Sequence, residues 1–463
     1  MASLKISDST MEIIAGGSLH DSLAVPGDKS IAHRAVMVAA LAPGRSFISG
    51  LPDGQDVAHT ISSVERIGVM VSPADDIPSN RDTGNSSRDT GNIVVEGGRE
   101  RIHPPADSLD MGNSGTGMRL MAGLLSGFPW TTRLVGDESL SKRPMDRIAV
   151  PLGMMGAVIT GQGGAGNKCH APLTVVGGKL HGIDYTLPQP SAQVKAAILL
   201  AGLSADGTTA VRETTPTRKH TEEIFNIAGI PVYIGSGSSG RAQNDIYTVS
   251  VEAAEPSPFN IDIPGDPSQA AFFIIAALII PESEVCVGPV YLGKDRVGFL
   301  EVLKRMGANI TLEMTGDEII PSGRIKATYS QLNSTTISAR EVASLVDEVP
   351  ILAVAAAVAR GVSIFEGLSE LRVKESNRLD GTANLVNSFG GNAHVEGDSL
   401  IISGTGSLKG GTIDARGDHR IAMAATVAAL VAAPGDQSII SGYQAITSSY
   451  PRFASDMSSV LGE

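Results

Sequence analysis

One pattern recurs six times along this chain and limits the folds available to it. Each copy has a polar turn with Gly, Pro or acidic residues, followed by a helix-prone run rich in Ala, Leu, Ile, Val and Met. The six runs are residues 31–41, 117–125, 194–203, 269–280, 349–359 and 421–433. Such helices have no extended polar face, so we expect each of them to be buried. Repetition of this kind indicates that one supersecondary unit is stacked several times.

Short β-prone runs and a second, more amphipathic helix complete most copies. Examples of the β-prone runs are residues 44–48, 207–211, 361–365 and 435–440. A glycine, the usual residue just past a helix C-terminus, follows most of the second helices: Gly68, Gly156, Gly229, Gly307 and Gly390. We expect the sixth copy to lack this glycine because the sequence ends at Glu463. Each copy reads as β-α-β-α-β-β, which is an α/β pattern.

Six copies suggest two domains of three copies each. We place the boundary at residues 262–264, so that an N-terminal-type lobe covers residues 26–263. The C-terminal-type lobe covers residues 264–463 together with residues 1–25, whose strand we expect to pair with the second half. The chain would then cross between the lobes twice, an arrangement that favours hinge motion. Residues 75–92 contain Arg-Asp-Thr-Gly-Asn twice and predict a flexible surface insertion.

Charge and residue usage exclude several classes of protein. The net charge of −13 argues against a nucleic-acid binder. The longest apolar run, residues 270–280, is too short to span a bilayer, and residues 1–10 lack the apolar segment of a signal peptide. Two cysteines, Cys169 and Cys286, fit a reducing compartment and share no motif with a histidine. We expect a cytoplasmic protein without a membrane partner. The histidines have no ligand-like spacing, so we expect no metal.

Basic residues concentrate at the starts of the six apolar helices and on adjacent loops. A helix N-terminus carries unpaired N–H groups and a partial positive charge, which favours phosphates and carboxylates. Several such starts facing one cleft would bind a strongly anionic ligand. The basic residues are Lys29, Arg34, Arg119, Lys142, Arg143, Arg147, Lys195, Arg372, Lys374, Arg378 and Arg420. Their placement in an acidic chain predicts an anion site.

Two segments offer groups for proton transfer. Lys374 and Arg378 are spaced i, i+4, which would put two like charges on one helical face, an arrangement that suits an anion site. Glu375 adds a carboxylate beside them, and Asp347-Glu348 at the head of another helix offers a base. Pro144 is expected in the first turn of a helix, which would put Lys142 and Arg143 at its start.

Taken together, the sequence motifs of this chain resemble those of the 5-enolpyruvylshikimate-3-phosphate synthase (3-phosphoshikimate 1-carboxyvinyltransferase) family. The matching stretches occur in family order: Gly27-Asp28-Lys29-Ser30 with Arg34, Gly112-Asn113-Ser114-Gly115-Thr116, Lys142-Arg143-Pro144-Met145, Pro190-Ser191-Ala192-Gln193, residues 372–379 and Asp418-His419-Arg420. The resemblance implies a two-domain enolpyruvyl transferase fold, an inside-out α/β barrel in which each domain holds three β-α-β-α-β-β units and the domains close on substrate. It also implies transfer of the enolpyruvyl group of phosphoenolpyruvate to the 5-hydroxyl of shikimate 3-phosphate, with release of phosphate. This reaction of the shikimate pathway to chorismate needs no cofactor and no metal, and we expect a monomer.

The resemblance also assigns residues. The shikimate-3-phosphate set is Lys29, Ser30, Arg34, Ser191, Ala192, Gln193, Thr217, Asp347 and Lys374. The phosphoenolpyruvate set is Lys29, Gly115, Arg143, Gln193, Arg378 and Arg420. Asp347 resembles the acceptor of the hydroxyl proton, and Glu375 resembles the proton donor to the methylene carbon, with Lys374 in the relay and Lys29 also catalytic.

Two positions depart from the family pattern. Gly117 stands where many members carry Ala, beside Gly115 and the phosphoenolpyruvate pocket, which bears on pocket width and on the response to glyphosate. Ser448 stands where some members carry a lysine. With Ser-Ala-Gln at residues 191–193 and no lysine at position 448, the sequence resembles the branch of the family often called class II.

Two other functions remain open. One is the sister transferase that acts on UDP-N-acetylglucosamine, which typically uses a loop cysteine near the second unit; Cys169 lies well beyond that loop. The other is a non-catalytic anion-binding homologue, against which the presence of Asp347, Lys374 and Glu375 argues.

Overall fold

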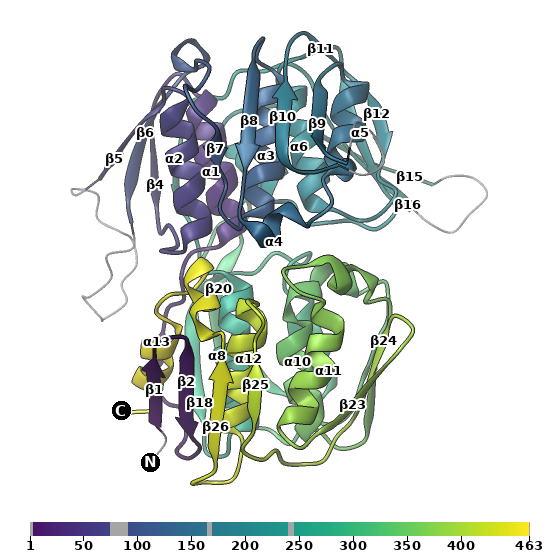
Figure 1. The fold of residues 1–463 in the computed structure, drawn as a ribbon. Helices are drawn as coiled ribbons and strands as arrows, with labels where there is room; N and C mark the ends of the chain where they lie inside the picture. Colours follow the sequence, from purple (N-terminus) through teal and green to yellow (C-terminus); the bar gives the residue numbers. More distant parts are fainter. Residues whose placement is uncertain (1–2, 75–90, 164–168, 239–244, 463) are drawn as a thin grey trace. The chain divides into compact units, whose positions relative to one another are not determined.

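The computed structural model describes residues 3–74, 91–163, 169–238 and 245–462 (Figure 1). The predicted insertion at 75–92 falls outside the described residues except for its last two positions. The described chain forms two compact units. Unit 1 holds the residues up to Gly27 and those from Pro264 onward, and unit 2 holds the residues between Asp28 and Ile263.

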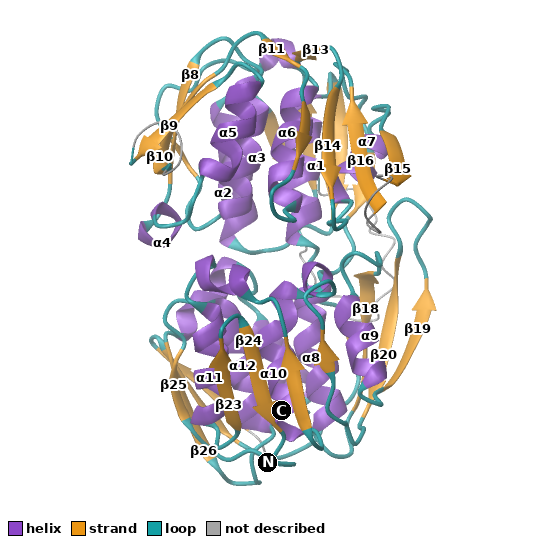
Figure 2. Cartoon of the chain, turned by 90° about the vertical axis from the view of Figure 1, so that its right-hand side faces the viewer, coloured by secondary structure: helices purple, strands orange, loops and turns teal. Residues whose placement is uncertain are grey.

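The six apolar runs form helices that lie inside their units, as predicted (Figures 1 and 2). In unit 2 they are α1 (Lys29–Leu41), α3 (Gly115–Ser126) and α6 (Ala192–Gly202). In unit 1 they are α8 (Pro267–Ile279), α10 (Val349–Val358) and α12 (His419–Leu430). The sixth helix ends three residues earlier than predicted, because Pro434 disfavours helical backbone at the residue before it.

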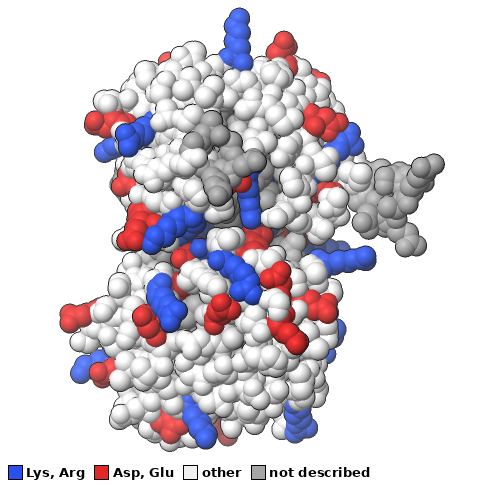
Figure 3. Space-filling view, turned by 45° about the vertical axis from the view of Figure 1, so that its right-hand side comes forward, with Lys and Arg blue, Asp and Glu red and all other residues white. Residues whose placement is uncertain are grey.

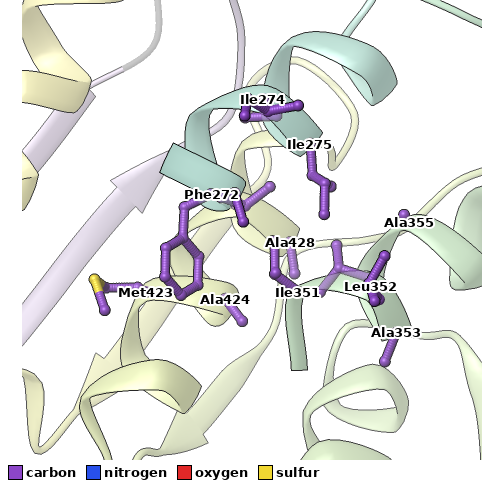
Figure 4. Close-up of a cluster of buried hydrophobic side chains, with 14 of the residues drawn as sticks. Phe272, Ile274, Ile275, Ile351, Leu352, Ala353, Ala355, Met423, Ala424 and Ala428 are labelled. Carbon is purple, nitrogen blue, oxygen red and sulfur yellow. The ribbon is translucent and has the colours of Figure 1, made fainter. Parts of the chain in front are cut away.

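The three inner helices of unit 1 pack against one another through alanines and larger apolar side chains. Figure 4 shows Phe272 of α8, Ile351 of α10 and Met423 of α12 in one cluster of fully or almost fully buried side chains. Ala355 and Ala424 lie in the same cluster, and their small side chains let the helix backbones approach closely. The helices thus form the centre of the core, and strands such as β18 and β20 add the buried side chains of their inner faces to it.

A second helix follows in each copy. These helices are α2 (Gln55–Arg66), α5 (Asp146–Met154), α7 (His220–Ile227), α9 (Gly298–Arg305), α11 (Arg378–Ser388) and α13 (Phe453–Val460). Shorter helical segments are α4 (Glu138–Ser141), η1 (Arg99–Arg101), η2 (Val342–Ser344), η3 (Val346–Glu348), η4 (Ser369–Val373) and η5 (Tyr443–Ser448).

The predicted glycines follow the second helices and have positive φ angles, at Gly68, Gly156, Gly229, Gly307 and Gly390. The expectation that the sixth copy lacks such a glycine is wrong. Helix α13 ends at Val460, and Gly462 follows it with φ +74°. A residue with a β-carbon would be strained in this left-handed conformation, which explains why glycine recurs at the position.

Each of the six copies contributes to a four-stranded sheet with one parallel and two antiparallel pairs. In unit 2 the sheets are β17 (Asn260–Asp262)-β4 (Gly44–Ser49)-β6 (Ile93–Gly97)-β5 (Met70–Pro73), β7 (Leu109–Asp110)-β8 (Thr131–Val135)-β10 (His170–Val176)-β9 (Val158–Gln162), and β12 (Asp184–Thr186)-β14 (Thr209–Glu213)-β16 (Asp245–Val251)-β15 (Tyr233–Ser238). A short pair, β11 (Leu180–His181) with β13 (Ala205–Asp206), accompanies them.

Unit 1 repeats this arrangement. Its sheets are β3 (Ser22–Leu23)-β18 (Glu284–Tyr291)-β20 (Ser322–Thr328)-β19 (Asn309–Met314), β21 (Thr336–Ile337)-β22 (Val362–Phe365)-β24 (Ser399–Ser403)-β23 (Asn392–Glu396), and β25 (Thr412–Asp414)-β26 (Gln437–Ser441)-β2 (Thr10–Ile14)-β1 (Ser3–Ser7). The N-terminal hairpin thus completes the sheet of the sixth copy, which confirms the expected pairing of the N-terminal segment with the second half.

Two strands, β3 and β17, each pair with a sheet of one unit but precede the first helix of the other unit. Strand β3 leads into α1 of unit 2, yet it pairs in parallel with β18 of unit 1. Strand β17 leads into α8 of unit 1, yet it pairs in parallel with β4 of unit 2. The chain therefore passes between the units twice, once after each of these strands.

No helix in the described ranges is long and apolar enough to cross a membrane.

Candidate functional site

The start of α1 brings together Lys29, Ser30 and Arg34. Asp28 caps the helix by accepting the N–H of Ile31, so Lys29 and Ser30 occupy the first helical positions. Lys29 Nζ lies 2.8 Å from Asp56 Oδ2 on α2, and its side chain keeps 20% of its surface exposed. Lys29 is therefore anchored, while part of it still reaches solvent.

Arg34 is almost fully buried one turn further along α1. Its Nε donates to Thr221 Oγ1 at 2.8 Å, and Nη1 donates to the Ser30 carbonyl at 2.7 Å. Nη2 lies 3.4 Å from the carbonyl of Ala192, the first residue of α6. Burial lowers the pKa of this guanidinium to about 10, so it stays charged at neutral pH. Arg34 joins two predicted stretches that are far apart in the sequence.

Arg119 of α3 links three of the predicted stretches. It donates to Gln193 Oε1 at 2.6 Å, to the Gly115 carbonyl at 3.3 Å and to the Pro144 carbonyl at 3.0 Å. A β-carbon on Gly115 would lie 2.9 Å from Arg119 Nη1 and 3.3 Å from Arg143 Nη1. The absence of a side chain at Gly115 is what lets the two guanidinium groups stand beside this helix start.

Arg143 is held by the loop before α3. It donates to the carbonyl and the side-chain oxygen of Asn113 and to Ser139 Oγ. Pro144 does not lie in a first helical turn as predicted, because α5 begins only at Asp146, with Met145 as its N-cap. Arg143 thus occupies the link between α4 and α5, where the Asn113 loop orients it.

His33 contacts the same loop through Ser114. Its Nδ1 lies 2.7 Å from Thr60 Oγ1, and its Nε2 lies 3.3 Å from Ser114 Oγ, the N-cap of α3. Because complete burial lowers the pKa of His33 to about 3, the ring is neutral at physiological pH. Ser114 Oγ accepts the N–H of Gly117. A neutral ring can donate to Thr60 from Nδ1 and accept from Ser114 at Nε2.

Ser191 and Thr217 hold different positions in the third copy. Ser191 caps α6 through the N–H of Val194, which places Ala192 and Gln193 in the first turn. The hydroxyl of Thr217 donates to Glu213, so this side chain is already engaged in a buried network.

Lys195, which we had counted among the anion-binding cations, belongs to that buried network. Its side chain is completely buried and lies 3.0 Å from Glu213 Oε2 and 2.8 Å from Glu222 Oε1. Burial alone would lower the pKa of Lys195, but the two carboxylates outweigh burial and raise it above the ordinary value. Lys195 is therefore a structural cation and not a ligand for solvent-borne anions.

In unit 1, Asp347 lies among three cations. Its carboxylate is 3.9 Å from Lys374 Nζ, 3.6 Å from Arg378 Nη1 and 3.9 Å from Arg420 Nη2. Arg420 Nη1 also donates to the Asp347 carbonyl at 3.1 Å. Lys374 reaches Glu370 Oε1 at 3.2 Å as well. The predicted base and three of the four predicted cations of this unit thus form one group, whereas Arg372 pairs with Asp380 and Asp398 instead.

Glu375 and Arg378 meet at the start of α11. Nη2 of Arg378 donates to Glu375 Oε2, while Nε donates to Asp418 Oδ2 at 2.9 Å. Although burial opposes ionisation of Asp418, the charge of Arg378 outweighs it and keeps the pKa of Asp418 below its ordinary value. Asp418 is also the N-cap of α12. One carboxylate therefore fixes both a helix start and an arginine.

The expectation that Lys374 and Arg378 share one helical face is wrong. Helix η4 ends at Val373, Lys374 is extended with φ −82° and ψ −153°, and α11 begins only at Arg378. The i, i+4 spacing assumed a continuous helix. The two cations instead converge because both point to Asp347.

Three of the six apolar helices have an aspartate as N-cap, so their N-termini are not free to bind another anion. Asp28, Asp266 and Asp418 cap α1, α8 and α12 and already place a negative charge there. Only Ser114 and Ser191 cap their helices with a neutral hydroxyl. The cations, more than the helix dipoles, thus supply the positive potential.

Ser448, the position where some family members carry lysine, ends η5. Its hydroxyl donates to the Ala445 carbonyl at 2.8 Å and lies 3.5 Å from His419 Nδ1. It supplies no charge.

Sequence reasoning missed Asp56 and Arg296, and it listed Arg119 only as one of the basic residues near the helix starts. Arg119 had a signal, since it stands four residues after Gly115 on the same helix. Asp56 and Arg296 had none, because their partners Lys29 and Glu348 lie far away in the sequence.

The acidic net charge is not gathered into one region on the face drawn in Figure 3. Lys and Arg side chains are interspersed there with Asp and Glu. Among the described residues no group of three or more His, Cys, Asp or Glu side chains could hold a metal ion.

Comparison with known proteins identifies the family. The family model of EPSP synthase (3-phosphoshikimate 1-carboxyvinyltransferase) matches residues 13–457. The chain belongs to the EPSP synthase family. A 3-phosphoshikimate 1-carboxyvinyltransferase of Oceanobacillus iheyensis is 39% identical over 450 residues, covering 96% of this chain and 97% of the relative. One of Streptococcus pyogenes is 41% identical over 444 residues, covering 95% and 96%.

Solved structures agree with the family. The EPSP synthase of Acinetobacter baumannii matches with a TM-score of 0.80 and 35% identity, covering 97% of this chain and 98% of that one. The enolpyruvyl transferase NikO of Streptomyces tendae matches with a TM-score of 0.71 at 18% identity and 97% coverage of this chain, which supports the fold alone. The predicted enolpyruvyl transferase fold of an EPSP synthase is therefore confirmed.

Proposed function

We propose that this member of the EPSP synthase family transfers the enolpyruvyl group of phosphoenolpyruvate to the 5-hydroxyl of shikimate 3-phosphate and releases phosphate. The observation that carries the proposal is the group around Asp347, in which one carboxylate stands among Lys374, Arg378 and Arg420. The name of the matching family supports the choice of reaction.

Binding of two anionic substrates needs cations that are already in place. We propose that Arg34, Lys29 and Ser30 at the start of α1 bind shikimate 3-phosphate together with Ser191, Ala192 and Gln193 at the start of α6. The contact of Arg34 with the Ala192 carbonyl supports a common site for the two helix starts. Thr217 is proposed for the same substrate, where its hydroxyl oxygen could act only as an acceptor while it donates to Glu213.

The phosphoenolpyruvate set is proposed in the same way. In unit 2 it contains Gly115, Arg143 and Gln193, with Lys29 shared between substrates. Arg378 and Arg420 supply the remaining cations. Guanidinium groups bind carboxylate and phosphate through paired hydrogen bonds, so buried and oriented arginines suit this role.

The chemistry requires one group to give a proton and one to accept it. We propose that Glu375 protonates the methylene carbon, after which the adjacent carbon is electrophilic and the 5-hydroxyl oxygen attacks it. Asp347 takes the hydroxyl proton. The tetrahedral intermediate then loses phosphate, and the Glu375 carboxylate takes a proton back from the methyl group, which restores the double bond.

The ion pair with Arg378 favours the ionised form of Glu375. Glu375 must therefore gain a proton before it can donate one. Lys374, the residue beside it, is proposed to supply that proton. The 3.9 Å distance from Lys374 to Asp347 places Lys374 beside the proposed acceptor.

The test compares acceptors. Purified protein with phosphoenolpyruvate and shikimate 3-phosphate should release phosphate and form one equivalent of product by mass spectrometry. UDP-N-acetylglucosamine in place of shikimate 3-phosphate should give no product above background. Turnover with the UDP-sugar alone, or binding of both anions without any turnover, would contradict the proposal in favour of the sister transferase or of a non-catalytic homologue.

We also propose that the protein acts in the cytoplasm as a monomer. The two free cysteines, Cys169 and Cys286, suit a reducing compartment. Light scattering with size-exclusion chromatography tests the oligomeric state, and a mass near 47.8 kDa is expected.

A further inference from the structure

A buried arginine outside the proposed substrate contacts joins two helix starts in unit 1. Arg296 Nη1 lies 2.9 Å from Glu348 Oε1, and Nη2 lies 2.9 Å from Asp266 Oδ1. Nη2 also donates to Ser268 Oγ, which in turn donates to Glu348 Oε1. Arg296 and Glu348 are each 1% exposed. Charged groups so deeply buried are stable only when each is paired.

The members of this cluster come from three segments. Asp266 is the N-cap of α8, Arg296 precedes α9, and Glu348 occupies the N-cap position of α10. Glu348 accepts no N–H of its own helix through its side chain. Its carboxylate is therefore committed to Arg296 and Ser268 and not to capping.

Glu348 adjoins the proposed base. Asp347 and Glu348 lie in the same short turn, η3, and Arg420 faces both of them. Arg420 Nη1 donates to the Asp347 carbonyl at 3.1 Å but stands 4.0 Å from Glu348 Oε1. Arg420 is thus within reach of a second, fully buried carboxylate that could attract it more strongly than a dissolved anion can.

We propose that Arg296 is a positioning residue, which neutralises Glu348 and thereby leaves Arg420 to Asp347 and to phosphoenolpyruvate. The proposal rests on the function proposed above. If Arg296 is removed, the charge of Glu348 draws Arg420 toward itself, because an unpaired buried carboxylate gains most from the nearest cation. Arg420 then leaves both the Asp347 carbonyl and the substrate anion.

This account predicts an asymmetry between two ways of breaking the same ion pair. Arg296→Met leaves the carboxylate charge and should raise the KM for phosphoenolpyruvate by about tenfold or more. Glu348→Gln removes the charge, leaves Arg296 paired with Asp266, and should keep that KM within about twofold of the wild type. A role of the ion pair in folding alone would not distinguish the two variants.

The decisive variant is the double substitution Arg296→Met with Glu348→Gln. It lacks the charge that captures Arg420, so the KM for phosphoenolpyruvate should return to within about threefold of the wild type. Arg296→Gln replaces Arg296→Met if the latter does not fold, because it also removes the positive charge. Arg296→Lys keeps a positive charge beside Glu348 and should raise the KM less. The KM for shikimate 3-phosphate should stay nearly constant in every variant.

A matched control removes another arginine from the neighbouring helix. Arg305 on α9 donates to Thr335, to the Thr336 carbonyl and to Glu341, none of which belongs to the Asp347 group. Arg305→Met should leave both KM values unchanged. Circular dichroism and thermal unfolding establish that each variant is folded.

The outcomes separate this inference from the proposed function. A wild-type protein without turnover on the two substrates refutes the function itself. A wild-type protein with turnover whose folded Arg296→Met or Arg296→Gln variant has an unchanged KM for phosphoenolpyruvate refutes the positioning role. The same holds if the double variant is as impaired as the single one. Recovery in the double variant supports it.

Discussion

Arg378 and Asp418 form an ion pair with hardly any solvent contact, in which Nε of Arg378 lies 2.9 Å from Asp418 Oδ2 and their side chains are 1% and 0% exposed. The same aspartate caps α12, and the same arginine reaches Glu375 and Asp347. This pair therefore connects the stability of unit 1 to the groups that we propose for proton transfer.

Substitution Arg378→Met should lower both stability and turnover. Removal of one partner of a buried ion pair leaves the other unpaired, which costs about 3 to 5 kcal/mol of unfolding free energy. Urea unfolding followed by circular dichroism measures this loss at pH 7. Turnover should fall by orders of magnitude even where the variant is folded. A folded variant with near-normal kinetics would count heavily against the proposed site.

The stability that the Arg378–Asp418 ion pair contributes should depend on pH in one direction. Because Arg378 keeps the pKa of Asp418 below its ordinary value of 3.8, Asp418 contributes stability above that value. This stability is lost as the pH falls through the lowered pKa of the folded state. The wild type should therefore lose more unfolding free energy than Arg378→Met as the pH is lowered from 5 to 3. Parallel curves for the two proteins would show that Asp418 gains nothing from Arg378.

Two buried neutral histidines should make the protein sensitive to mild acid. Burial lowers the pKa of His33 to about 3 and that of His220 to about 4, from the ordinary value of 6.5. Below pH 6.5 the unfolded chain binds protons that the folded chain does not. This contribution to stability is therefore complete above pH 6.5 and is lost as the pH falls, by about 1.4 kcal/mol per pH unit for each ring, down to about pH 4 for His220 and about pH 3 for His33.

Substitution His33→Gln tests this dependence. In the variant, the unfolding free energy should fall less steeply between pH 6 and pH 4.5, because one of the two buried rings no longer contributes to the decline. Urea titrations at four pH values suffice. An unchanged slope would mean that His33 is protonated in the folded protein and that its hydrogen bonds to Thr60 and Ser114 follow another pattern.

Substitution Lys29→Met should separate catalysis from folding. Lys29 is proposed to contact both substrates, so its loss should lower kcat/KM by about a hundredfold or more. Its side chain is partly exposed, and we expect the thermal midpoint to change little. Lys142→Met is the matched control, because Lys142 is exposed and pairs only one turn away with Glu138. Equal kinetics for the two variants would remove Lys29 from the site.

Substitution Gly115→Ala should impair phosphoenolpyruvate binding. A β-carbon there lies 2.9 Å from Arg119 and 3.3 Å from Arg143, so the two guanidinium groups must shift. The expected result is a higher KM for phosphoenolpyruvate with a smaller change for shikimate 3-phosphate. Gly153→Ala on α5 is the control, since a β-carbon at Gly153 meets nothing within 4 Å. That control should add about 0.5 to 1 kcal/mol of stability without kinetic effect. A Gly115→Ala variant with the KM values of the wild type would show that the arginines do not depend on this glycine.

Features with a local cause could be predicted from the sequence. Ala-rich runs without a polar face predicted the inner helices, and glycines predicted the ends of five of the six second helices. The glycine after the sixth, Gly462, was not predicted, because it lies next to the last residue of the sequence. The Asp347 group was predicted because its members lie in short, charged phrases.

Features that depend on long-range pairing could not be predicted. Arg296 and Glu348 are 52 residues apart, and no spacing rule connects them. Lys195 looked like a site cation because it follows the Ser191 phrase by one helical turn, yet Glu213 and Glu222 enclose it. The error at Lys374 has the reverse cause, since an i, i+4 rule was applied across a break in the helix.

The fate of one oxygen atom tests the central claim most directly. Enolpyruvyl transfer breaks the bond between carbon and the bridging oxygen of phosphoenolpyruvate, whereas phosphoryl transfer or simple phosphate-ester cleavage breaks the bond to phosphorus. With phosphoenolpyruvate labelled by ¹⁸O at the bridge, and with shikimate 3-phosphate present, we predict that ³¹P NMR will show the label in the released phosphate. Unlabelled phosphate, or phosphate release that does not require shikimate 3-phosphate, would contradict the account.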